Sequence, residues 1–159
     1  MNKRMWLIVF FIVMMMVPIN GYSQIVYQKG SLKGIKSFDI NFGVDEIGNL
    51  KEGVIRNDVK KLILQSGITI DEEAKGVLNI GVQTHQNKDK YKLVVYVISI
   101  SFTQFVKTFN SNILIDAITW NSTEFGLVSI KKVETLRQNI KDLVDEFIVD
   151  FLEENPKKK

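Results

Sequence analysis

The chain has 159 residues, of which 45% are hydrophobic and 25% charged, and it contains one histidine and no cysteine. This composition is typical of an ordinary globular protein, neither disordered nor fibrous. The lack of cysteine excludes a disulfide framework, a thiolate zinc site, an iron–sulfur cluster and a cysteine nucleophile. A single histidine also excludes a metal site built from two or three imidazoles of one chain.

The first 23 residues predict a secretory signal peptide. Lys3 and Arg4 form a short basic start, residues 5–17 carry no charge, and Pro18 ends that run. Such a basic start and short apolar centre are typical of export signals. A membrane span needs roughly 20 apolar residues, so the run is too short for an anchor.

We place the cleavage after Ser23, because Gly21 and Ser23 supply the small residues at the −3 and −1 positions. We therefore expect an exported protein, periplasmic or extracellular, with no membrane span in the mature chain. No cysteine lies near the cleavage point, so we expect no lipid anchor.

Removal of the signal leaves 136 of the 159 residues, close to the common size of one domain. Loss of Lys3 and Arg4 lowers the number of basic residues from 21 to 19 against 18 acidic ones, so the net charge falls from +3 to +1. We expect no nucleic-acid partner from this balance. The predicted organisation is a flexible lead-in at residues 24–36, one α+β domain at 37–156 and a basic tail at 157–159.

Hydrophobic periodicity predicts four strands and two helices. Alternating apolar residues indicate strands at residues 37–44, 77–85, 91–109 and 113–121. Residues 126–129 either extend the last of these strands or begin the connection to the final helix. Helical spacing indicates a first helix that ends near Gly67. The last helix carries one apolar stripe, formed by Val133, Leu136, Ile140, Leu143, Val144, Phe147, Ile148 and Phe151. The order βαβββα predicts a two-layer α+β sandwich, with a four-stranded mixed sheet and both helices on one face.

The uncovered face of this sheet is predicted to be polar on its first two strands, at Asp39, Asn41, Asn79, Gln83 and His85. On the other two strands it is predicted to be apolar, and an exposed apolar patch marks a contact site. Its predicted members are Tyr91, Leu93, Val95, Val97, Leu114, Ile118 and Trp120. Two alternatives stay open: residues 24–36 cover the patch, or a β-bulge exchanges the faces along the long strand.

The titratable residues give no catalytic set. His85 is interpreted as a solvated strand-end residue, and no G-x-S-x-G motif accompanies it. The acidic run 71–73 lacks the spacing of a calcium loop and is interpreted as a solvated turn. Glu124 has only Asp116 as a second carboxylate on its strand, which makes a weak case for a glycosidase. We expect no enzyme activity, no metal and no cofactor.

The βαβββα order resembles that of small periplasmic accessory proteins, including the penicillin-binding-protein activators and the lipopolysaccharide-assembly lipoproteins. The acidic turn with Ala74 before residues 77–80 is similar to the entry into their second strand. The ending at residues 143–148 and 155–157 also resembles uncharacterised secreted bacterial proteins. The resemblance implies a non-enzymatic envelope protein. Those families are usually anchored through an N-terminal cysteine, which this chain lacks.

Three functions follow as hypotheses. The first is an accessory module that binds another envelope protein through the uncovered sheet face. The second is a small-ligand or glycan binder that uses Trp120, Tyr96 or Tyr91 as a stacking platform. The third is a homo-oligomer that buries the same patch against its own copy.

Overall fold

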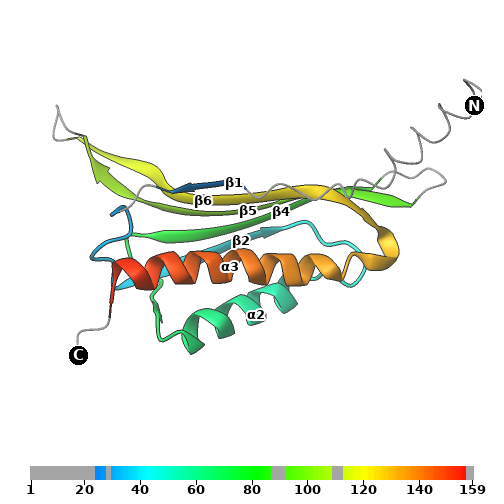
Figure 1. Cartoon of the computed structure of the whole chain (residues 1–159), viewed down its shortest axis with the longest axis horizontal. Helices are drawn as coiled ribbons and strands as arrows, with labels where there is room; N and C mark the ends of the chain where they lie inside the picture. The colour runs from blue at the N-terminus through cyan, green and yellow to red at the C-terminus, as the bar shows by residue number, and fades with distance from the viewer. Residues whose placement is uncertain (1–23, 28–29, 87–91, 109–112, 157–159) are drawn as a thin grey trace, which may run out of the picture.

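The computed structural model describes residues 24–27, 30–86, 92–108 and 113–156. A single mixed sheet carries both described helices on one of its faces, and no helix of the described residues lies on the opposite face (Figure 1). The six strands follow the spatial order β1-β6-β5-β4-β2-β3. They are β1 (Gln24–Tyr27), β2 (Ser37–Val44), β3 (Thr69–Ile70), β4 (Val77–Gln86), β5 (Leu93–Lys107) and β6 (Leu114–Ser129).

The predicted α+β class with two helices is confirmed, whereas the prediction of four strands is wrong. The two additional strands are the short edge strands β1 and β3, which have too few residues for a recognisable alternation. β2 pairs in parallel with β4 and with β3, and the other neighbours pair antiparallel. The predicted signal and tail, residues 1–23 and 157–159, lie outside the described residues.

The two helices are α2 (Glu52–Gln65) and α3 (Thr135–Glu154), and a short 3-10 helix, η1 (Ile130–Lys132), leads into α3. All eight residues of the predicted apolar stripe are buried. Phe147 lies at its centre, with ring centroids 5.5 Å from Phe38, 5.6 Å from Phe102 and 5.1 Å from Trp120. This aromatic cluster joins α3 to strands β2, β5 and β6.

An ion pair joins the two helices at their surface. The Arg137 guanidinium donates two hydrogen bonds to the Asp58 carboxylate, one of them at 2.9 Å, and the Lys141 ammonium lies 3.4 Å from the same group. The hydrogen bonds from Arg137 lower the pKa of Asp58 below its ordinary value. Asp58 on α2 thus fixes α3 laterally while the aromatic cluster fixes it against the sheet.

A β-bulge divides β6 into two halves with opposite side-chain phase. Phe102 pairs with Trp120, but Thr103 pairs with Ile118, so Thr119 is an extra residue in β6. The extra residue exchanges the two faces of the strand. Ile118 therefore points to the uncovered face and Trp120 to the helices, although only two positions separate them. The sequence analysis considered a bulge in the long strand at residues 91–109, but β5 keeps one alternation and the bulge lies in β6 instead.

Phe147→Ala is expected to lower the free energy of unfolding by about 3–5 kcal/mol, because it leaves a cavity among buried aromatic rings. Urea denaturation followed by circular dichroism measures this loss. Val149→Ala is the matched control, since Val149 lies on the same helix with 55% of its surface exposed. The control should change the free energy by less than about 0.5 kcal/mol. Equal losses in the two variants would contradict a central role for Phe147.

Candidate interaction face

The uncovered sheet face has small polar residues in its middle. Residues paired across antiparallel strands, or aligned in register, direct their side chains to the same face. The register aligns two transverse rows on β2, β4, β5 and β6, namely Gly43, Gly81, Ser99 and Thr123, and next to it Asn41, Asn79, Ser101 and Asn121. The Asn79 amide donates to the Thr103 hydroxyl at 2.9 Å. The polar outer face predicted for the first two long strands is confirmed at Asn41 and Asn79. The same rows remain polar across the middle of β5 and β6, where an apolar face was predicted.

Apolar residues gather at the end of this face where β5 begins and β6 ends. Val95 pairs with Leu127, and Val97 pairs with Phe125, so these four side chains lie side by side. Val95 is 46%, Phe125 53% and Leu127 56% exposed. We name this group the outer apolar patch, and with the neighbouring residue on β5 it consists of Leu93, Val95, Val97, Phe125 and Leu127.

The structure brings together only part of the predicted patch. Leu93, Val95 and Val97 lie in the outer apolar patch as expected. Leu114 and Ile118 are also exposed on this face, at 65% and 64%, but they lie at the far end of the β5–β6 hairpin, beyond the two polar rows. Tyr91 lies outside the described residues.

The prediction that Trp120 lies on the uncovered face is wrong. Its side chain is fully buried against Phe147, and its indole N–H donates to the Asp150 carboxylate at 2.7 Å. The bulge at Thr119 is the physical reason, because it rotates Trp120 toward α3. Tyr96, the second residue of the predicted stacking platform, is only 8% exposed and also faces the helices.

Sequence reasoning missed Phe125 and Leu127, the two most exposed residues of the patch. The signal was present, since the apolar residues Phe125 and Leu127 alternate with Glu124 and Gly126. It was obscured because the fourth strand was expected at residues 113–121, with residues 126–129 left open as an extension or a connection, whereas β6 runs without a break to Ser129.

The described lead-in does not cover the patch. β1 extends the sheet at its edge by pairing with residues 120–123 of β6. Leu32 is fully buried near the end of α3, where its N–H donates to the Glu154 carboxylate at 3.1 Å and its carbonyl accepts from the Asn155 amide at 2.8 Å. The alternative in which residues 24–36 shield the outer face is therefore wrong for the described part of that segment.

Polar groups between α3 and β6 are used to hold the two layers together. The Ser122 hydroxyl donates to Glu146 at 3.2 Å, and the Tyr96 hydroxyl donates to Glu124 at 2.8 Å. The Asn139 amide donates to the same Glu124 carboxylate. Burial, followed by the nearby Glu124 carboxylate, raises the pKa of Tyr96 to about 12. The Tyr96 hydroxyl in this seam between α3 and β6 therefore stays protonated and is held by Glu124, so it does not act as a nucleophile.

The remaining candidate residues stay solvated. His85 is exposed at the end of β4, as expected. The Asp71 carboxylate accepts hydrogen bonds from the Ser37 hydroxyl and the Glu73 N–H, which closes the acidic turn on itself. Within the described ranges, no three histidine, aspartate or glutamate side chains are grouped closely enough to hold a metal ion. Neither helix in those ranges is long and apolar enough to cross a membrane.

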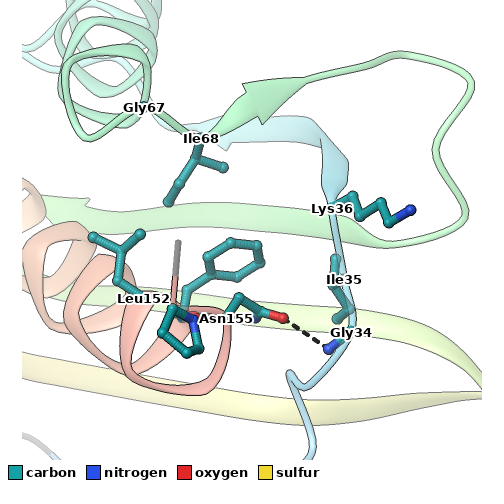
Figure 2. Close-up of a pocket in the computed structure, with 9 residues that line it drawn as sticks. Gly34, Ile35, Lys36, Gly67, Ile68, Leu152 and Asn155 are labelled. Carbon is teal, nitrogen blue, oxygen red and sulfur yellow. Dashed lines mark hydrogen bonds between the residues drawn. The ribbon is translucent and has the colours of Figure 1, made fainter. Parts of the chain in front are cut away.

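Two hollows were considered as ligand sites. One, of about 360 Å³, lies where Gly34–Lys36 and Gly67–Ile68 meet the end of α3 (Figure 2). Its Asn155 side chain is engaged, since the Oδ1 atom accepts from the Gly34 N–H at 2.7 Å and the Nδ2 atom donates to main-chain carbonyls. Its walls are otherwise mostly apolar, and Figure 2 shows the Lys36 side chain directed away from them. It fits a packing seam better than a chemical site.

The second hollow, of about 390 Å³, lies beside the outer apolar patch. Val95 and Val97 form one side of it, and Gln83 and His85 belong to the neighbouring strand. The Asp45 carboxylate at its rim accepts from the Thr84 N–H at 2.9 Å. The patch and this hollow together form an uneven surface with apolar side chains, polar side chains and the Asp45 carboxylate.

Comparison with known proteins leaves this chain without an assigned family. No family model and no curated protein matches it. Among solved structures, a minor lipoprotein from Acinetobacter baumannii is similar, with a TM-score of 0.38 and 13% identity, over 78% of this chain and 96% of that one. A PelC dodecamer from Paraburkholderia phytofirmans gives a TM-score of 0.43 and 11% identity, over 83% and 96%. At these values the similarity assigns neither a family nor a function.

Introducing an aspartate on one or the other face of β6 should have opposite consequences. Trp120→Asp buries a carboxylate in the aromatic cluster and should prevent folding, because a buried unpaired charge costs several kcal/mol. Phe125→Asp places the same group on the uncovered face and should leave the secondary structure and its cooperative unfolding intact. Circular dichroism with thermal unfolding measures both. A folded Trp120→Asp variant would contradict the observed phase of β6.

Proposed function

We propose that this chain is an exported, non-catalytic module that binds another protein of the cell envelope through the outer apolar patch. The observation that carries the proposal is the exposure of adjacent apolar side chains on β5 and β6, with Val95, Phe125 and Leu127 about half exposed. Scattered exposed apolar residues are ordinary, but a contiguous group rimmed by polar residues is typical of an interaction site. The polar rows and the Gln83–His85 hollow supply such a rim.

The non-catalytic part of the proposal is supported by the use of the polar groups. Asp150 and Glu146 accept hydrogen bonds from Trp120 and Ser122 of β6, and Asp58 is paired with Arg137 between the helices. Glu124 accepts from Tyr96 and Asn139. Asp150 and Glu146 also line a hollow of about 420 Å³ on α3, but both carboxylates hold the helix to β6 there. The patch itself carries no titratable side chain, so binding is the chemistry that it offers.

Export is the second part of the proposal, and it rests on the signal pattern of the first 23 residues. Mass spectrometry of the protein isolated from its host should show a chain that begins at Gln24, as glutamine or as its cyclised pyroglutamate form. A protein that begins at Met1 would contradict export by cleavage and would leave the binding proposal to stand alone.

The glycan alternative has lost its expected platform. Trp120 is buried, Tyr96 is nearly so, and Tyr91 lies outside the described residues. The exposed aromatic ring that remains on the patch is Phe125, flanked by Val97 and Leu127 rather than by a set of hydrogen-bonding side chains. This environment favours an apolar protein surface over a sugar.

A photo-reactive amino acid at residue 125 tests the proposal in the native host. We expect an adduct heavier than the chain from residue 125 and none from residue 79, which lies on the polar half of the same face. Mass spectrometry of the adduct identifies the second component. Both residues face outward, so the pair controls for random collision.

Val97→Asp, introduced together with the probe, tests whether the adduct depends on the outer apolar patch. It should reduce the adduct at least about tenfold, because a charge placed in a desolvated contact costs more than 1.4 kcal/mol. Adducts of equal yield from residues 125 and 79, unaffected by Val97→Asp, would overturn the proposal. An adduct of twice the chain mass would identify a second copy as the occupant and would also overturn it.

A further inference from the structure

One side of the β6 backbone next to the outer apolar patch has no pairing partner among the described residues. The Ile130 N–H donates to the Lys92 carbonyl of the neighbouring chain segment at 2.9 Å, which fixes the hydrogen-bonding phase of the strand end. In an antiparallel ladder, residues alternate in the side to which both their N–H and C=O groups point. Even-numbered residues of this end therefore bond to β5, and Phe125, Leu127 and Ser129 direct their backbone groups away from it.

No described residue pairs with this side of β6 after Thr123. The described pairing of β1 covers residues 120–123 and starts with Gln24 opposite Thr123. Residues before Gln24 lie outside the described ones, and the cleavage after Ser23 in the proposed function removes them, so the edge in question is that of a mature chain that begins at Gln24. β6 itself continues to Ser129. The edge at residues 124–129 thus presents a row of main-chain donors and acceptors directly beside the exposed Phe125 and Leu127 side chains.

This edge lacks the usual protection against added strands. Natural proteins guard open edges with charged side chains, prolines or bulges. The segment 124–129 contains no proline, and its single charged residue is Glu124. That carboxylate is drawn beneath the sheet by the Tyr96 hydroxyl and the Asn139 amide, so it does not shield the edge. The bulge at Thr119 precedes the residues that pair with β1, whereas the segment 124–129 follows them, so the bulge does not distort this edge.

We propose that the partner binds as an added β-strand on residues 124–129 of β6, with apolar side chains at every second position. This inference rests on the proposed function and specifies how its partner is held. Main-chain hydrogen bonds to Phe125, Leu127 and Ser129 provide the attachment, as in other cases of strand addition. The outward side chains of the added strand then lie beside Phe125 and Leu127 and continue the outer apolar patch.

The occupant follows from the continuity of these two features. Side chains of the added strand alternate between the two faces, so one set meets the apolar patch and the other approaches α3 near Asn139. A partner strand of alternating apolar and polar residues satisfies both environments. A globular surface without a free strand would contact the patch but leave the backbone groups of the edge unused.

A short peptide with lysine at both ends and alternating threonine and valine between them serves as the defined probe. Added to the exported protein purified from its host, it should slow hydrogen exchange at the Phe125, Leu127 and Ser129 amides at least about tenfold. The amides of even-numbered residues, already bonded to β5, are the internal reference. The same peptide with a central proline should have no effect, because it cannot form a continuous strand.

Leu127→Pro and Leu127→Ala separate the backbone contribution from the side chain. Both shorten an exposed apolar side chain, but only proline removes the outward N–H and places its ring against the incoming strand. Fluorescence anisotropy of the labelled peptide should show binding about tenfold weaker for proline than for alanine.

Ser129→Pro against Ser129→Ala repeats this comparison without backbone strain. Ser129 already has φ −67°, which matches proline, and both substitutions remove the hydroxyl that accepts from the Lys131 N–H. This pair remains informative even where Leu127→Pro fails to fold. Proline should again weaken binding several-fold more than alanine.

The outcomes separate this inference from the proposed function. Equal binding by the proline and alanine variants, with unchanged exchange at the edge amides, overturns strand addition, while a residue-125 adduct sensitive to Val97→Asp still supports the patch. Absence of any peptide binding also overturns it. Edge amides protected in the free protein, together with twice the chain mass in sedimentation, would assign the edge to a second copy and overturn it as well.

Discussion

Both helices pack against the same face of the sheet, and this one-sided cover determines the properties of every other surface. Phe147 and its stripe on α3 fill the inner side, where inner residues of β2, β4 and β5 together with Trp120 of β6 form the buried apolar core. The outer rows receive no such cover from the described residues. A sheet covered on one side requires polar outer residues when it acts alone. The outer apolar patch departs from that requirement, and its departure is what gives the face a functional interpretation.

The elements with strong local periodicity could be predicted from the sequence. The α3 stripe needs only the 3.6-residue repeat, and all its predicted members are buried. The four longer strands likewise follow from alternation. β1 and β3 could not be found, because strands of four and two residues depend on the neighbour that they join rather than on their own pattern.

The candidate site was predicted for β5 and mostly mispredicted for β6. Leu93, Val95 and Val97 keep a strict alternation and lie where expected. On β6 the alternation continues through Ile118 and Trp120 in the sequence, but the bulge between them reverses the phase. A bulge arises from pairing with the neighbouring strand and from the fit of the indole against Phe147, neither of which a single-strand pattern contains. The same reversal turns Phe125 and Leu127 outward.

The seam beneath β6 links the stability of the fold to the chemistry of its edge. Glu124 is satisfied by Tyr96 and Asn139, so the carboxylate that would repel or solvate an added strand contributes to holding α3 instead. Gly126 permits this arrangement, since a Cβ atom there would lie 2.8 Å from the Tyr96 hydroxyl oxygen. The glycine and the inward glutamate therefore serve the inner layer, and as a consequence residues 125–129 carry no charged side chain at this edge of the described sheet. Specificity at such an edge comes from the side chains of the patch, because the main-chain hydrogen bonds of a strand are the same for every sequence.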